Sequence, residues 1–455
     1  MGRCYTRRVQ GLIRPAPRAR SILRWVVFLA LWGLITHGTH AGTGDEPHYL
    51  AIAHSIAFDG DLDLSNNYGP NEPLIAGGTL RMEAHVQPGS GGVLRPVHDI
   101  GLPLLFAPYV RVAEPLTRAL VRTLPAPLLQ RARLTPGVLY RHLLSMAMIV
   151  LATVLATMMF DTFLALGASG GAALASAVLL MLSPPLLIFS VLFFTELLSA
   201  LIGFAVFRRI LLVDTIGGWR WALVGCATGF LFLIHAKNIG LIVPLVAIGL
   251  YTLRAPERRR EAGLFALGAG LMLLVRSAVN FSFWGSPISG PHARFAASGS
   301  SDLLHEALIR IAGLTVDQEF GLLPYAPIYV LAPIGAIALA RANRTLALSA
   351  LLIVGVYVAL IVAPPINVHG WMGGWNPPAR FLTPVAPLLG LFVFAGMRAL
   401  PSVLVMPVLL LQIVISAYAW QHPKMLWNDG NGRAAFCEIT GSRICDRLPS
   451  LVEGS

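Results

Sequence analysis

Charged residues are scarce in this sequence. Only 12% of its 455 residues are Asp, Glu, Lys or Arg, about half of the roughly 25% found in soluble domains. Hydrophobic residues make up 56% of the chain, and the mean hydropathy is +0.69. Many apolar runs approach the roughly 20 residues that a helix needs to cross about 30 Å of hydrocarbon. These features argue against a soluble enzyme and predict an all-α polytopic membrane protein.

Acidic residues are fewer still, at 22 against 34 Lys and Arg, which leaves a formal net charge of +12. In a soluble protein this excess would suggest a nucleic-acid partner. Here the basic residues lie mostly between or beside apolar runs, where they orient spans and meet anionic headgroups. No basic patch is interleaved with aromatic residues as in a nucleic-acid groove. We therefore expect membrane lipids, and no nucleic acid, among the partners.

Motifs for soluble nucleotide chemistry are missing as well. The chain has no Walker A loop and no GxGxxG following a strand. It also has no HExxH pair, so no tight ligand spacing indicates a metal. The acids of "FDGDLDLSNN", residues 58–67, match a calcium loop in composition but lack the EF-hand spacing. We interpret that stretch as a polar loop.

The apolar windows predict about eleven spans. A basic segment, 1–21, precedes them and is expected in the cytoplasm. A signal peptide that is cleaved near Ala41 is the alternative for the first span. The transmembrane domain is expected at 22–420, with a long first outer loop at 41–137 and an outer tail at 421–455. The predicted spans are 22–40, 138–160, 170–189, 195–212, 219–235, 239–253, 262–280, 324–340, 345–363, 381–397 and 400–419.

The distribution of arginine supports this tracing. With a cytoplasmic N-terminus, the inward connections hold most of the basic residues and the short outward ones hold few, as the positive-inside rule requires. Within the first outer loop, residues 47–58 are expected to form a short helix. Residues 101–124 mix apolar and basic side chains and suit a helix lying in the membrane interface. The inward arginines are Arg208, Arg209, Arg220, Arg254, Arg258, Arg259, Arg260, Arg341, Arg344 and Arg398.

Cysteine is rare, with four in the chain. Cys437 and Cys445 lie eight residues apart in the tail that an odd number of spans places outside. In an oxidising compartment such a pair is expected to form a disulfide; two free thiols are the alternative.

The few acids that lie at membrane boundaries are the first candidates for chemistry. Asp45 and Glu46 follow the first span, and Glu196 lies in apolar sequence where the third span turns into the fourth. All three fall on the outer side of the predicted topology. An ionisable residue at membrane depth is costly and indicates function by default. A helix cap at Asp45 and an interfacial charge at Glu196 are the plainer interpretations.

Cations and histidines lie on the same predicted side. Lys237, one of two lysines, separates the fifth and sixth spans, and Arg276 and Arg380 lie at outer span ends. Lys and Arg bind phosphate and stabilise a leaving group that gains negative charge; each can also be a snorkelling anchor. The histidines expected outside are His48, His54, His85, His98, His235 and His369.

Some of these histidines can contact a substrate or a metal. His48, near Glu46, and His235, across the bundle, are candidate ligands of a divalent metal. His98 is a candidate for substrate or metal contact. Hydrogen-bonding histidines without a ligand are the alternative, and no cofactor is certain.

The stretch "TGDEPHYLAIAHSIAFDGDLDL" after a basic-flanked first span resembles the first outer loop of the GT-C superfamily of membrane glycosyltransferases. Protein O-mannosyltransferases and lipid A aminoarabinose transferases belong to it. "FSVLFFTELLSALIGFAVF", "NFSFWGSPISG", "GLLPYAPIYVLAP" and "GWMGGWNPPARFLTPVAPLL" resemble further stretches of bacterial members. The likeness extends from Thr43 to about Leu389.

This resemblance implies transfer of a sugar from a polyprenyl-phosphate donor to an acceptor hydroxyl, with inversion, outside the bacterial inner membrane. The acceptor is a glycan, a lipid or a protein. Asp45 would be the general base, with Glu46 orienting the acceptor or a metal. Glu196 takes the place of the second acid, where relatives often carry Asp. Lys237, Arg380 and Arg276 would bind the donor phosphate.

A transporter or lipid flippase is the main alternative. Such proteins place ionisable groups near the bilayer midplane, on broken helices and often in repeated halves. Here the acids cluster at one predicted surface and no convincing internal repeat is visible, although Arg276 can lie deeper. A non-catalytic scaffold and an acyltransferase are further alternatives.

The predicted topology can be tested at the tail. We expect a membrane-impermeant thiol reagent, added to intact cells after reduction, to modify Cys437, because an odd number of spans places the tail outside. Labelling that appears only after the membrane is opened would contradict this topology.

Overall fold

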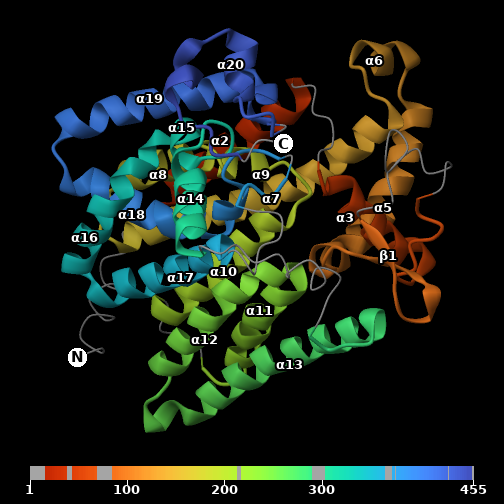
Figure 1. The fold of residues 1–455 in the computed structure, drawn as a ribbon, viewed down its shortest axis with the longest axis horizontal. Helices are drawn as coiled ribbons and strands as arrows, with labels where there is room; N and C mark the ends of the chain where they lie inside the picture. Colours follow the sequence, from red (N-terminus) through yellow and green to blue (C-terminus); the bar gives the residue numbers. More distant parts are fainter. Residues whose placement is uncertain are drawn as a thin grey trace.

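The computed structural model describes residues 16–37, 44–68, 85–212, 217–288, 303–363, 371–374, 376–428 and 430–452. Across these residues the chain is almost entirely helical, and a two-stranded antiparallel sheet is the only sheet they form. Figure 1 shows the helices gathered into one body, with the sheet and the helices of the first loop at one side. The predicted all-α fold is confirmed.

The first half of the chain forms these elements: α2 (Pro17–His37), α3 (Glu46–His54), η1 (Ser55–Asp59), β1 (Val86–Pro88), β2 (Leu94–Pro96), α5 (Gly101–Thr123), α6 (Ala126–Arg131), α7 (Pro136–Ala165), α8 (Gly170–Met181), α9 (Leu186–Phe189), α10 (Thr195–Leu211) and α11 (Arg220–Ile234).

The second half forms these elements: η3 (Ala236–Asn238), α12 (Ile239–Thr252), α13 (Arg259–Trp284), α14 (Leu303–Val316), α15 (Leu322–Tyr325), η6 (Pro327–Leu331), α16 (Ala332–Ala342), α17 (Arg344–Val362), η7 (Arg380–Val385), α18 (Ala386–Ala399), α19 (Ser402–Gln421) and α20 (Ala435–Thr440).

Six of the described helical segments are long and apolar enough to cross a membrane by themselves. They contain α2, α7, α13, α17, α18 and α19. Shorter apolar helices occupy other predicted spans, among them α8, α11 and α12. The membrane class follows from these helices, whereas the total of about eleven spans stays a prediction.

Proline explains where a predicted span is interrupted. The run 170–189 is divided into α8 and α9, because Pro184 and Pro185 follow the end of α8 and cannot supply the N–H groups that would continue it. The run 324–340 is divided in the same way into α15, η6 and α16, with Pro327 at the start of η6. The short helix expected at 47–58 is α3, which has Pro47 in its first turn and continues as the π-helix η1.

The core lies between α7, α10 and α18. Phe163 of α7 stacks on Phe394 of α18 with ring centroids 4.5 Å apart, and α18 is buried along most of its length. Helices α13 and α19 lie outside this core and expose many apolar side chains, including Leu267 and Leu274 of α13. Such faces suit contact with lipid tails, which do not penalise exposed leucine.

Glycines bring α11 and α13 into close contact. A Cβ atom on Gly225 would lie 2.0 Å from the carbonyl oxygen of Phe265, and one on Gly268 would lie 2.1 Å from that of Ala222. Gly229 is similarly close to Ala269. Small residues at four-residue spacing allow two membrane helices to approach until their backbones touch. This contact fixes α11, whose C-terminal end enters the turn that carries Lys237.

Charged residues lie at both ends of α10 and of the η7–α18 segment. Helix α10 begins with Glu196 in its first turn and ends with Arg208 and Arg209. The η7–α18 segment likewise begins at Arg380 and has Arg398 in its last turn. At 1.5 Å per residue, the 17 residues of α10 separate its ends by roughly 25 Å.

The arginine ends meet one another. Arg20, at the start of α2, pairs with Asp161 near the end of α7 at 2.7 Å, and Arg398 donates to the carbonyl oxygen of Leu166 at 2.7 Å. Arginines of α2 and α18 thus gather at the C-terminal end of α7, whereas Glu196 and Arg380 lie at the opposite ends of α10 and of the η7–α18 segment.

The C-terminal tail folds back onto the turn between α14 and α15. Asp317 accepts a hydrogen bond from the backbone N–H of Leu451 at 2.7 Å, and Glu319 accepts one from Gly432 at 2.8 Å. Cys437 and Cys445 form a disulfide, so the predicted pairing is confirmed. Figure 1 shows the tail helix α20 beside α19.

The glycine contact can be tested by one substitution. We expect Gly225→Val to lower the free energy of unfolding by about 1–3 kcal/mol, because the added side chain forces α11 and α13 apart. The measurement is the denaturation midpoint of the purified protein in mild detergent. Gly270→Ala, at a position of α13 with open space around the new Cβ, is the control. Equal midpoints for both variants would contradict the close contact.

Candidate functional site

Four charged side chains from distant parts of the sequence meet in one network, which we name the ionic cluster: Asp45, Glu196, Lys237 and Arg380. Arg380 donates through Nη2 to Oδ2 of Asp45 at 2.5 Å and through Nε to Oε1 of Glu196 at 2.8 Å. Lys237 Nζ lies 2.8 Å from the same Glu196 oxygen. Glu196 is completely buried and Arg380 is 6% exposed. Charges this deep are retained only when they are paired.

Local backbone structure places each member of the cluster. Asp45 immediately precedes α3, and its carbonyl oxygen accepts the N–H groups of His48 and Tyr49. Glu196 lies in the first turn of α10, where the positive end of the helix dipole favours a carboxylate. Lys237 lies in η3, the short break between α11 and α12. Each charged group therefore projects from a helix end.

Arg380 follows an unusual backbone position. Ala379 has φ +55°, in the left-handed region that residues other than glycine rarely adopt. Its N–H donates to the carbonyl oxygen of Phe320 at 2.9 Å, and its side chain is buried. Phe320 belongs to the turn that the C-terminal tail covers. The tail therefore supports the conformation from which Arg380 enters the cluster.

Aromatic rings surround the two cations. Lys237 Nζ lies 4.3 Å from the centroid of the Phe381 ring, and Arg380 Cζ lies 4.9 Å from that of Phe194. Both distances are within the range of cation–π attraction. The rings exclude water and also attract the positive charges. Because the effective dielectric constant is low in such surroundings, the ion pairs of the cluster are stronger than they would be in water.

The surroundings of Asp45 favour its ionised form. Burial alone would raise its pKa, but the positive charge of Arg380, with a smaller effect of His98 and His85, holds the pKa well below its usual range. A carboxylate of such low pKa is a weak base while this pairing lasts.

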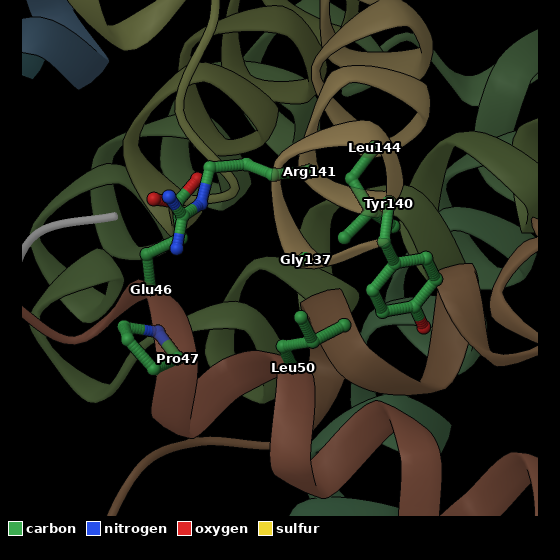
Figure 2. Close-up of a pocket in the computed structure, with 7 residues that line it drawn as sticks. All are labelled: Glu46, Pro47, Leu50, Gly137, Tyr140, Arg141 and Leu144. Atoms are coloured by element: carbon green, nitrogen blue, oxygen red, sulfur yellow. The ribbon is translucent and has the colours of Figure 1, made fainter. Parts of the chain in front are cut away.

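Glu46 faces away from the ionic cluster. Its Oε1 accepts the backbone N–H of Phe193 at 2.9 Å, and the side chain is buried. It lines a small pocket with Arg141 and Tyr140 of α7, and Figure 2 shows Arg141 extending toward it. Neither α7 residue was expected in the site; the one sequence signal is an arginine close to the start of an apolar run. The remaining lining residues are Pro47, Leu50, Gly137 and Leu144.

Three histidines stack beside Asp45. The rings of His48 and His85 lie 3.4 Å apart between centroids, and His85 Nδ1 lies 2.8 Å from His98 Nε2. His48 Nδ1 also lies 2.8 Å from the hydroxyl of Tyr68. Burial and the neighbouring histidines lower the pKa of His48 to about 3, so its ring is neutral.

The structure does not assemble the expected metal ligands His48 and His235 around Glu46. His235 instead accepts the N–H of Lys237 through Nδ1 at 3.2 Å, and this nitrogen lies 3.8 Å from Asp99. Within the described part of the chain, the group with metal-ligand spacing is Asp45, His85 and His98, whose ligand atoms all lie within 4.8 Å of one another. His369 lies outside the described residues.

Arg276 belongs to a second ion pair. Its Nη2 lies 2.5 Å from Oδ1 of Asp99, while Oδ2 of Asp99 accepts the N–H of Ala236 at 2.7 Å. The described contacts thus connect Arg276 to the ionic cluster indirectly, through Asp99 and the turn that holds Lys237. The sequence interpretation missed Asp99, although it directly follows His98 in "RPVHDIG".

Comparison of the chain with protein-family models, with curated proteins and with solved structures finds no match.

The ionic cluster makes a measurable prediction for stability. We expect Glu196→Gln to lower the free energy of unfolding by about 3–5 kcal/mol, because it leaves Lys237 buried without its carboxylate partner. Glu261→Gln, which removes the partly exposed Arg258–Glu261 pair, should cost less than about 1 kcal/mol. Unfolding of both variants in mixed detergent micelles gives the comparison. Combining Glu196→Gln with Lys237→Met should recover part of the loss; strictly additive losses would argue against a direct pair.

Proposed function

We propose that this protein is a membrane glycosyltransferase of the GT-C kind. It transfers a sugar from a polyprenyl-phosphate donor to an acceptor hydroxyl at the outer face of the bacterial inner membrane, with inversion. The observation that carries the proposal is the ionic cluster, which holds two carboxylates and two cations at one end of an apolar helical body. A base and phosphate-binding cations are the groups that such a transfer needs.

The orientation is supported by Arg20 and Arg398, which gather at the C-terminal end of α7, away from the ionic cluster. Arginine accumulates on the cytoplasmic side of membrane proteins, which favours an ionic cluster on the outside. Nucleotide sugars are cytoplasmic, so an outward site calls for a lipid-linked donor. The apolar tail of that donor can lie along the exposed faces of the helices while its phosphate reaches the cluster.

In the proposed reaction the acceptor oxygen attacks the anomeric carbon from the side opposite the phosphate. A C–O bond to the acceptor forms as the bond to the phosphate oxygen breaks. The phosphate leaves with that electron pair, and the acceptor proton passes to Asp45. Arg380 and Lys237 stabilise the negative charge that grows on the departing phosphate.

The pairing of Asp45 with Arg380 gives donor binding a second effect. When a phosphate draws Arg380 away, Asp45 loses the positive neighbour that depresses its pKa, so its basicity rises. The donor thereby prepares the base that the acceptor requires. Glu196 keeps Lys237 and what remains of the Arg380 contact in position, a role that suits a completely buried carboxylate.

Transport or lipid flipping is the competing function, and the charge distribution supports it less well. A transporter binds its substrate near the bilayer midplane, whereas the ionic cluster lies where four helices or turns begin. Arg276, the one cation that could have marked a deeper site, is paired with Asp99. No described contact favours a moving element.

The test is Asp45→Asn in the full-length protein. We expect transfer to fall by at least about 100-fold, because general-base assistance contributes about 10²–10⁴-fold, while expression and membrane insertion persist. Asp63→Asn, at a partly exposed carboxylate of the same segment that bonds to Ser65, is the matched control and should retain transfer.

The substrates can be found by mass spectrometry of glycolipids and surface glycans from cells with and without the gene. Cells that carry only Asp45→Asn should show the same missing sugar as cells without the gene. Normal transfer by this variant would reject the assignment of the base.

A further inference from the structure

The β1–β2 hairpin brings two histidines together beside Asp45. Val86 pairs with Pro96 in the antiparallel register, and Val97 donates its N–H to the carbonyl oxygen of His85 at 3.0 Å. His98 follows directly, so the open end of the hairpin holds His85 and His98 next to each other. Their facing ring nitrogens are 2.8 Å apart. The backbone ladder thus fixes this pair before any ligand binds.

Asp45 supplies the third donor from a different element. Its carboxylate and one nitrogen from each of the two histidines all lie within 4.8 Å of one another. In a tetrahedral site with metal–ligand bonds of about 2.0–2.2 Å, neighbouring ligand atoms lie about 3.4 Å apart. The observed donor–donor distances, from 2.8 Å up to at most 4.8 Å, lie on both sides of this value, so they are compatible with one shared ion.

From this geometry we infer that Asp45, His85 and His98 bind a divalent transition-metal ion, with zinc the best fit, and leave a coordination position open to an oxygen ligand. Two imidazole nitrogens with one carboxylate are a donor set that zinc prefers. Magnesium and calcium prefer sites made of oxygen ligands. Three protein ligands with an open position are typical of catalytic rather than structural zinc.

The charge of the ionic cluster supplies an independent reason for a cation. Asp45 and Glu196 carry two negative charges, and Lys237 and Arg380 carry two positive ones, so their sum is zero. Arg276 is likewise balanced by Asp99. A phosphate that enters the ionic cluster would therefore meet no excess positive charge. A divalent ion bound to Asp45 would raise the net charge of the cluster to +2. This part of the inference rests on the proposed function; the metal site itself does not.

The contacts of Asp45 and His48 are compatible with this site. Arg380 bonds to Oδ2 of Asp45, and a carboxylate has a second oxygen for the ion. His48 packs its ring against His85 and contacts the Tyr68 hydroxyl, so it holds the ligand ring in place from outside the coordination sphere. A metal ion at this position would supply Lewis-acid stabilisation to an oxygen ligand and lower the pKa of a hydroxyl bound to it. An acceptor bound there would therefore need a weaker base than a free hydroxyl does, which is compatible with proton transfer to a metal-bound Asp45.

The experiment measures metal binding by the tag-free, full-length protein in detergent, without donor or acceptor. After removal of metal with a chelator, we expect one Zn²⁺ per chain by calorimetry and by elemental analysis. Co²⁺ should give the visible absorption of a tetrahedral complex. His85→Gln and His98→Gln preserve hydrogen bonding and should each weaken binding by more than about 100-fold. His48→Phe, which keeps the stacked ring, should change the affinity by less than about tenfold.

His422→Ala, at an exposed histidine elsewhere, should bind Zn²⁺ like the unmodified protein. Undiminished binding by the double variant His85→Gln/His98→Gln, or no zinc binding by the unmodified chain, would overturn the site. The double variant must elute as a single species with an unchanged denaturation midpoint. If the protein binds zinc but transfers no sugar, the proposed function is rejected and the metal site stands. If the protein transfers sugar but binds no zinc, the metal site is rejected and the proposed function stands.

Discussion

A buried arginine determines much of this architecture. Arg380 is almost without access to water, and a guanidinium in such surroundings cannot lose its proton, so it needs carboxylates close by. Asp45 and Glu196 provide them, although 335 and 184 residues of sequence separate them from Arg380. The start of α3, the start of α10 and the start of η7 therefore have to converge. Lys237 joins the same carboxylate from the α11–α12 turn, which adds a fourth segment to the constraint.

Convergence of four segments requires helices that approach closely at other points. The glycine contact between α11 and α13 serves this purpose, since it fixes the direction in which α11 delivers its C-terminal turn. Asp99 adds a polar connection there, because one carboxylate oxygen accepts the backbone N–H of Ala236 while the other pairs with Arg276. Packing and ion pairing thus act on the same turn from two sides. Disturbing either one is expected to displace Lys237 from Glu196.

Local features of the fold could be predicted from the sequence, because each has a local cause. Apolar run length predicts the helices, Pro47 predicts the start of α3, and two cysteines near each other in a tail predict the disulfide. The grouping of Asp45, Glu196, Lys237 and Arg380 on one side followed from tracing the spans with the positive-inside rule. Which of them touch could not be predicted, since ion pairs depend on helix rotation rather than on order along the chain.

The partners of two other residues show the same limit. Arg276 was expected beside Lys237 and Arg380 as a phosphate ligand; in the structure its partner is Asp99, which lies just after the hairpin in a stretch without a recognisable pattern. Glu46 is adjacent to Asp45 in sequence but, one step into α3, it projects toward α7 instead. Consecutive residues of a helix point in directions about 100° apart, so the two carboxylates meet different neighbours. The sequence alone does not show which helices those neighbours belong to.

The tail has a consequence for the order in which the molecule is assembled. Leu451 and Gly432 bond to the turn whose Phe320 carbonyl holds Ala379 in its left-handed conformation. Arg380 is therefore synthesised well before the segment that supports its backbone, so the ionic cluster depends on a contact that forms late in synthesis. Until the tail has been synthesised, the backbone that presents Arg380 therefore lacks one of its supports.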